Sequence, residues 1–256
     1  MRNRVLSNIT SILSLAIVLS TVANPGAAVA QQSSFFAQDL TLHQTTTSSG
    51  RGGKGDNKSA EATTYFSRDA MRASSAESYD TIIRFGEGKM ITIDHKKKTY
   101  TESTLQELQD KLDKMAAEMG KNKEEMEALQ KMMGKTAGPI TVTKVGPGES
   151  IAGYATEKYV ISGPMEWEIW AAPDLKIPAA YYDAMKLRAP ANPMFDMRKM
   201  YDEFKKIDGM TMKTVMTLKM MGMSSTTTTV VNSVDKAPIP PDTFQAPTGY
   251  KLMPAK

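Results

Sequence analysis

The sequence predicts an α+β fold in which one antiparallel sheet of about ten strands carries a single long helix. Segments with alternating apolar and polar residues recur along most of the chain, and short turns separate them. The period changes to three or four residues over one stretch, residues 103–134, which is typical of an amphipathic helix. The chain has 256 residues and no cysteine, so its core must be held by packing without disulfides.

Residues 1–30 have the pattern of a secretory signal peptide. Two arginines precede an apolar run at residues 9–22, and an A-x-A site follows. We expect cleavage after Ala30, one mature domain over residues 31–256, and a periplasmic or secreted location. A retained membrane anchor fits less well, because the apolar run is short and is interrupted by serine and threonine.

The charge balance of the mature chain is close to neutral. Removal of Arg2 and Arg4 lowers the formal net charge from +4 to +2, with 30 basic residues against 28 acidic ones. This balance argues against a nucleic acid partner. Histidine occurs twice and cysteine is absent, so we expect no cofactor that depends on these residues. No later segment has the apolar length of a transmembrane helix.

Five short strands are expected before the long helix, and turns as short as theirs require antiparallel pairing. Residues 90–102 form a hairpin, in which Ile91 and Ile93 face the core while His95 to Lys97 make the turn. A flexible loop rich in glycine and serine separates the first two strands. The expected strands cover residues 38–46, 63–68, 78–85, 90–94 and 98–102, and the loop covers residues 48–60.

The long helix begins where the fifth strand ends. Ser103 is the expected N-cap, with Gln106 three residues later as in a capping box. Gly120 is a possible break. The apolar stripe could pair in a coiled coil, but docking across the sheet is the favoured interpretation for one isolated helix in a β-rich chain.

Strands resume after Gly138-Pro139, and two short helices flanked by prolines interrupt them. Alternation is clearest at residues 209–220, where Met210, Met212 and Met216 share a face with Leu218 and Met220. The expected strands cover residues 140–145, 153–162, 165–172, 209–220 and 226–234, and the helices cover residues 179–188 and 194–207.

Several motifs in a fixed order resemble a family of exported bacterial proteins. The segments TYFSRDAMR, IIRFGEGKMITIDHKKKTYTE, GESIAGYATEKYVI, EWEIWAAPDLKIP and PTGYKL are similar to those of the domain-of-unknown-function family DUF4412. This resemblance covers roughly residues 35–253, with residues 103–134 as a helical insert.

More remotely, the layout is similar to the LolA/LolB lipoprotein-carrier superfamily. That resemblance implies a strongly curved antiparallel sheet, an open half-barrel, whose concave face is covered by the long helix and the short helices. It also implies a place for acyl chains between the sheet and the helices, although a fold by itself does not establish a function.

The sequence favours a protein that is not an enzyme. Asp94 and His95 are neighbours on a strand and therefore point to opposite faces. Glu166 and Glu168 are paired carboxylates, but they lie on the polar face of a predicted strand, where solvation explains them. No sequence motif of a nucleophile elbow or a zinc protease is present. We therefore expect no catalytic residues.

Methionine is the unusual residue, with twenty in the chain. Most fall on expected core faces, so simple core packing is the first interpretation, and an adaptable apolar groove is the second. The third is Cu(I) binding in the periplasm, with Met220, Met221 and Met223 as the thioether ligands.

The expected function is that of an exported binding or carrier protein for a lipid or another hydrophobic ligand, with a possible envelope protein partner. A structural envelope protein whose groove is filled by its own helix is the alternative. The groove candidates are Ile91, Ile93, Leu108, Leu112, Met115, Met119, Trp167, Ile169, Met212, Met216 and Leu218.

Overall fold

Twelve strands form one open sheet in the part of the chain that the structure describes. The computed structural model describes residues 36–49, 58–75, 79–120, 140–162, 166–187, 197–220 and 223–254. The expected signal peptide, residues 50–57 of the expected flexible loop and residues 121–134 of the expected helix lie outside these ranges.

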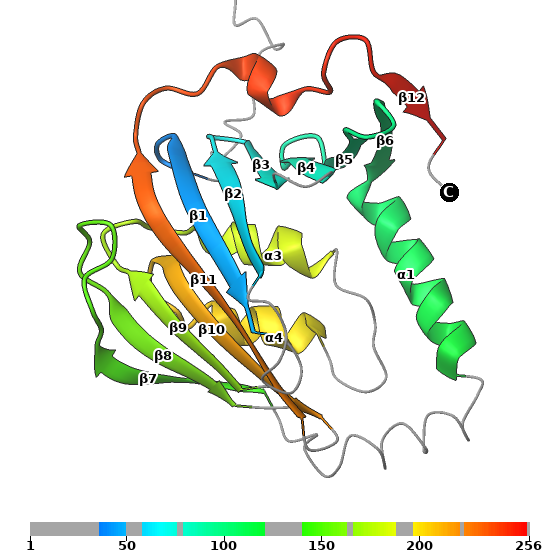
Figure 1. Cartoon of the computed structure of the whole chain (residues 1–256). Coiled ribbons are helices and arrows are strands. Elements are labelled where there is room, and N and C mark those ends of the chain that lie inside the picture. Colours follow the sequence, from blue (N-terminus) through cyan, green and yellow to red (C-terminus); the bar gives the residue numbers. More distant parts are fainter. Residues whose placement is uncertain are drawn as a thin grey trace, which may run out of the picture. The chain divides into compact units, whose positions relative to one another are not determined.

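The sheet is curved, and its two edge strands do not pair with each other (Figure 1). The strand order is β12-β6-β5-β4-β3-β2-β1-β11-β10-β9-β8-β7. The strands are β1 (Leu40–Ser48), β2 (Lys58–Phe66), β3 (Ala70–Ser75), β4 (Tyr79–Arg84), β5 (Lys89–Asp94), β6 (Thr99–Thr104), β7 (Thr141–Pro147), β8 (Glu157–Ser162), β9 (Glu166–Ala172), β10 (Met210–Met220), β11 (Met223–Asp235) and β12 (Lys251–Met253). The helices are α1 (Leu105–Gly120), α3 (Ala179–Lys186), α4 (Met197–Phe204) and the 3-10 turn η2 (Pro241–Phe244).

Two strands exceed the expected number. β3 has the sequence AMRASS, which lacks the β-branched and aromatic residues that mark strands, yet it pairs with both β2 and β4. β12 pairs with β6 in parallel over three residues, so the expected all-antiparallel sheet is wrong at this edge. Parallel strands need a long connection, because a short turn can join only antiparallel strands. The long C-terminal segment that precedes β12 provides this connection.

Two antiparallel meanders, β1–β6 and β7–β11, meet where β1 pairs with β11. Each of the two long strands beside this junction carries a β-bulge. In β11 the extra residue is Asn232, between the pairs Gln44↔Val231 and His43↔Ser233. In β10 the extra residue is Met212, which lies between the pairs Thr211↔Ala171 and Lys213↔Trp170. Bulges of this kind bend a strand and redirect its side chains.

The sheet has apolar packing on both faces. Ile83 and Ile82 are neighbours on β4 and point to opposite faces, and both are fully buried. Ile83 belongs to the cluster that includes Met185 of α3, and we call that side the helix face. Ile82 packs instead with Phe244 of η2, so we call that side of β3–β6 the strap face and residues 236–253 the C-terminal strap.

A buried charge network ties the strap to the sheet. The Asp80 side chain is 1% exposed and accepts hydrogen bonds from Arg72 Nε at 2.9 Å and from Ser74 Oγ at 2.9 Å. His95 Nε2 lies 3.1 Å from Asp80 Oδ2, and its Nδ1 lies 3.0 Å from the hydroxyl of Tyr250 in the strap. The partner of His95 is therefore Asp80 on the neighbouring strand β4, and not the adjacent Asp94.

Arginine side chains bind the strap backbone directly. Arg72 Nη1 donates to the carbonyl of Thr243 at 2.8 Å, and Arg84 donates twice to the carbonyl of Phe244, at 3.1 and 3.0 Å. Backbone carbonyls that are removed from water need a hydrogen-bond donor. Arg72 and Arg84 supply that donor for two carbonyls of the short η2 turn. The strap thus covers the apolar strap face of β3–β6.

Helix α1 continues directly from β6 and is capped one residue later than expected. The backbone N–H of Glu107 donates to Thr104 Oγ1 at 3.0 Å, and the Glu107 carboxylate accepts from the N–H of Thr104 at 2.8 Å. This is a reciprocal capping box. Ser103, the expected N-cap, belongs to β6, where it pairs with Met90. The strand β6 therefore ends at Thr104, two residues later than the expected strand, which ended at residue 102.

The described part of α1 does not establish the expected docking across the sheet. Leu105 is buried, whereas Leu108 and Leu112 are only half-buried. The helix contacts the sheet at β6, from which it starts, and Asp113 accepts a hydrogen bond from Arg198 of α4 at 2.5 Å. The helices that pack on the sheet in this part of the chain are α3 and α4 (Figure 1).

Replacing Asp80 by Asn should destabilise the fold by about 3 kcal/mol. This value is near the lower end of the range for breaking a buried ion pair, because the Arg72 side chain is partly exposed. Burial would raise the pKa of Asp80, but hydrogen bonds from Arg72, His95 and Ser74 outweigh it and hold this pKa below 3.8. Folding stability from this carboxylate is thus present above pH 3.8 and is lost as the pH falls through the lower folded-state pKa.

Urea unfolding across a pH series measures both effects of the Asp80→Asn change. The variant should lose part of the acid-dependent decrease in stability, whereas the matched change Asp202→Asn, at an exposed pair with Lys186, should alter stability little. Equal losses in the two variants would contradict the role given to the buried network.

Replacing Thr104 by Ala should lower the free energy of unfolding by about 1 kcal/mol, because the first turn of α1 loses its side-chain cap. Ser103→Ala is the matched control and should have a smaller effect, since Ser103 lies in β6. Urea unfolding of the two variants decides between the observed and the expected cap.

Candidate functional site

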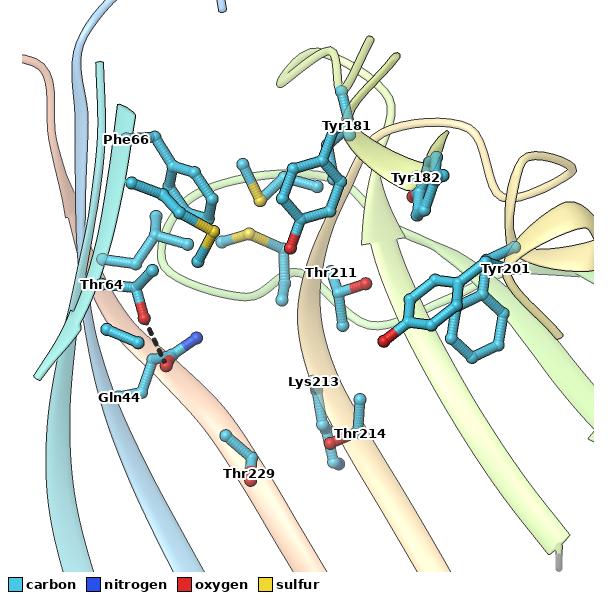
Figure 2. Close-up of a pocket in the computed structure, with 17 residues that line it drawn as sticks. Gln44, Thr64, Phe66, Tyr181, Tyr182, Tyr201, Thr211, Lys213, Thr214 and Thr229 are labelled. Carbon is cyan, nitrogen blue, oxygen red and sulfur yellow. Dashed lines mark hydrogen bonds between the residues drawn. The ribbon is translucent and has the colours of Figure 1, made fainter. Parts of the chain in front are cut away.

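A pocket of about 370 Å³ lies between the helix face and the helices α3 and α4. Its walls come from β1, β2, β3 and β11 on one side, from β10 in the middle, and from α3 and α4 on the other side (Figure 2). This volume falls within the range of about 300 to 1,000 Å³ that is usual for small-molecule sites. Strands from both meanders contribute, so the pocket depends on the β1–β11 junction.

One end of the pocket is apolar and buried. Leu42, Phe66, Met71, Met210 and Met212 line it, and each is at most 7% exposed. Their strands alternate, so each contributes the side chains of one face. The unbranched methionine side chains among them can adapt to more than one ligand shape.

The other end carries polar side chains that are only half-buried. Gln44, Thr64, Thr214 and Thr229 line it, on four different strands. Thr64 Oγ1 donates to Gln44 Oε1 at 3.4 Å (Figure 2). The Thr229 hydroxyl lies 2.9 Å from that of Thr46. The pocket thus changes from apolar to polar along the strands.

Lys213 also lines the pocket, but its ammonium group lies elsewhere. Its Nζ donates to Glu149 Oε1 at 2.5 Å and sits 4.5 Å from the centroid of the Trp170 ring. Lys213 and Trp170 are cross-strand partners on the sheet face opposite the helices. The positive charge is therefore neutralised outside the pocket.

Aromatic rings form the helical wall. The Tyr181 ring of α3 packs edge-on against Phe36, Phe66 and Phe85, with centroids 5.8 to 6.2 Å apart. Figure 2 shows the Tyr181 and Tyr201 rings directed towards the strands. Edge-to-face contacts of this kind hold a helix in one orientation on a sheet.

Ion pairs join the two helices that make this wall. Lys186 of α3 donates to Asp202 of α4 at 2.7 Å, and Lys205 donates to Asp183 of α3 at 2.5 Å. The hydrogen bond from Lys186, with a smaller contribution from Lys205, lowers the pKa of Asp202. Glu203 fixes α4 to the sheet by accepting from the N–H of Val142 at 3.1 Å.

Of the eleven groove candidates, the pocket includes Met212 alone among the described side chains. Ile91 and Ile93 lie in the strap-face cluster, so the sheet separates them from Met212. Trp167 and Ile169 pack in a third cluster with Phe204, which lines the pocket from α4. Met216 is half-buried on the helix face, opposite Trp167 on β9.

The remaining candidates are not brought together with the pocket. Leu108 and Leu112 are on α1, away from the pocket walls. The side chains of Met115, Met119 and Leu218 lie outside the described part of the structure. The same holds for the suggested copper ligands Met220, Met221 and Met223.

Sequence reasoning missed most of the lining residues. Alternation at residues 40–44 could have marked Leu42 and Gln44 as one face, and the aromatic pair Tyr181-Tyr182 could have marked α3 as a packing helix. The threonines offered no such signal, because threonine on a strand usually faces solvent.

Other chemistry is sparse in the described residues. They contain no group of three or more His, Asp or Glu side chains placed to hold a metal ion. Glu168 pairs with Lys158 at 2.5 Å. None of the helices among these residues has the length and apolarity needed to cross a membrane.

Comparisons with known proteins give a family and a set of distant structural likenesses. A family model described as "Domain of unknown function (DUF4412)" matches residues 54–250, as the motifs predicted. No curated protein matches the chain in sequence.

Among solved structures, the chain is similar to an uncharacterized conserved protein from Thermus thermophilus. The identity is 8% and the TM-score 0.44, with 85% of this chain and 91% of that chain covered. It is also similar to MucB, at 9% identity and TM-score 0.37, with 85% and 60% covered. A LolA superfamily protein from Nitrosomonas europaea matches at 7% identity and TM-score 0.30, with 81% and 90% covered. At such distances the pocket must be interpreted from its own residues.

Folding stability should fall between pH 10 and about 12 because of Tyr182, which closes the pocket from α3. Burial raises the pKa of Tyr182 to about 12, and the neighbouring Tyr159 adds to the rise. The unfolded chain ionises this group near pH 10, so stability is fully present below that value and is lost as the pH rises towards 12. Tyr182→Phe should remove this loss, which urea unfolding in alkaline buffers and tyrosinate absorbance both measure.

Proposed function

This chain belongs to the DUF4412 family, and we propose that it is a non-enzymatic exported protein that binds a hydrophobic ligand in the pocket between its sheet and the helices α3 and α4. The observation that carries the proposal is the pocket of about 370 Å³ with a buried apolar end. A structural protein with a self-filled core would need no such space, since protein interiors are normally close-packed.

The apolar end supplies the binding energy. A ligand that packs against Phe66, Met71 and Met212 removes its own apolar surface from water, at roughly 25 cal/mol per Å². Methionine side chains can rearrange around chains of different shape, which suits a carrier better than a site of strict shape. The twenty methionines of the chain are consistent with this use.

The signal-peptide pattern of residues 1–30 supports export to the periplasm or beyond. The structural use of Asp80, His95 and Tyr250, which form the network that fastens the strap, supports the proposal that the protein is not an enzyme. Lipids and other hydrophobic molecules of the envelope are then the accessible ligands.

Replacing Thr229 by Phe should weaken ligand binding by at least tenfold, because the new ring occupies the pocket. Thr228→Phe is the matched control: Thr228 is the next residue of β11, faces the other side of the sheet and pairs with Val215. Binding is measured by displacement of a fluorescent fatty acid and by mass spectrometry of co-purified lipid.

The unmodified protein should bind in this assay, and the control variant should bind equally well. Failure of a full panel of lipids and fatty acids to bind would refute the proposed function. Unchanged affinity in the Thr229→Phe variant would show that the ligand binds elsewhere.

A further inference from the structure

The polarity of the pocket changes in one direction. The strand side chains at its buried end carry no amide or hydroxyl group, while Gln44, Thr64, Thr214 and Thr229 stand at the half-buried end. The helical wall adds the hydroxyl groups of Tyr181, Tyr182 and Tyr201, which are also uncharged at neutral pH. Amide and hydroxyl groups both donate and accept, so they can satisfy a head group that does the same. A ligand with a hydrocarbon tail and a hydroxylated or amide head matches this order.

No charged group within the described lining can neutralise an ionised head. The one charged lining residue is Lys213, whose ammonium is held by Glu149 and Trp170 on the other sheet face. An ionised group that enters such a pocket loses its hydration without gaining a counter-charge, which is strongly unfavourable. The pocket therefore favours uncharged ligands.

The volume limits the ligand to one chain. An apolar cavity of about 150 Å³ holds one benzene molecule. At the same packing, 370 Å³ holds roughly fifteen non-hydrogen atoms, which corresponds to a medium-length chain with a small head. A two-chain lipid exceeds this space.

We infer that the pocket selects a neutral single-chain amphiphile, with its chain among Phe66, Met71 and Met212 and its uncharged polar head against Gln44, Thr214 and Thr229. This inference rests on the proposed function, because it specifies the ligand class of the same pocket. It adds a preference that an apolar groove by itself would not have.

Three probes with the same eight-carbon chain test the preference: 1-monooctanoylglycerol, octanoate and octyltrimethylammonium. Each is titrated calorimetrically, below its micelle concentration, into the purified full chain. The neutral probe should bind at least tenfold more tightly than either ion, because it alone enters without losing the hydration of a charge. Dioctanoylglycerol should bind more weakly than the monoacyl probe.

A charge placed in the pocket should change the selectivity. Thr214→Lys introduces an ammonium beside the head site, so octanoate should bind at least tenfold more tightly than it binds to the unmodified protein. Thr217→Lys is the matched control, since Thr217 lies on the same strand but on the opposite face. It should leave the octanoate affinity unchanged.

Gln44→Leu is a second variant, which remains informative even if Thr214→Lys does not fold. It removes the amide at the polar end, so the affinity for 1-monooctanoylglycerol should fall several-fold while the affinity for octane stays the same.

The outcomes separate the two proposals. Ionic probes that bind as tightly as the neutral one would overturn the selectivity and leave the proposed function standing. The absence of binding by every probe, and by the lipid panel, would overturn both. A tenfold neutral preference that Thr214→Lys abolishes for octanoate would establish the selectivity.

Discussion

The pairing of β1 with β11 is the interaction on which the rest of the structure depends. Eight residue pairs, from Thr41↔Asp235 to Ser48↔Thr227, join the two meanders into one sheet. Hydroxyl contacts across the junction, such as Thr46 to Thr229 at 2.9 Å, add to the backbone ladder. Because β1 brings Leu42 and Gln44 while β11 and β10 bring Thr229 and Met212, this junction also creates the pocket. Neither meander contains both walls by itself.

The two faces of the sheet have different tasks, and the irregular features of the strands separate them. The bulges at Met212 and Asn232 lie beside the pocket, where they change the alternation of β10 and β11 relative to their neighbours. On the strap face, the C-terminal strap fills the apolar surface with Phe244 and secures it through Asp80 and its partners. The pocket and the closure of the core by the strap therefore lie on opposite sides of the sheet.

Alternation along the chain predicted most strands and the β5–β6 hairpin, because it reports directly on which side chains share a face. It could not predict β3, whose sequence lacks strand-forming residues, or β12, whose pairing depends on a distant edge. It also could not place Ile91 and Ile93. The sequence of a strand that is covered on both faces does not indicate which face carries the pocket. Only the structure shows that Ile91 and Ile93 lie on the face opposite Met212. The threonines of the pocket were missed because a polar residue on a strand normally signals solvent.

The distance along the chain between β1 and β11 also affects how the protein folds. The partners of β1 residues 41–48 on β11 lie at residues 227–235, so almost the whole domain must be present before this ladder can close. Contacts of such high sequence separation slow folding, because the loop between the strands must be ordered first. Until then β1 is an open sheet edge, a surface on which partly folded chains can associate. The pairing that creates the pocket thus also covers an edge on which partly folded chains could associate.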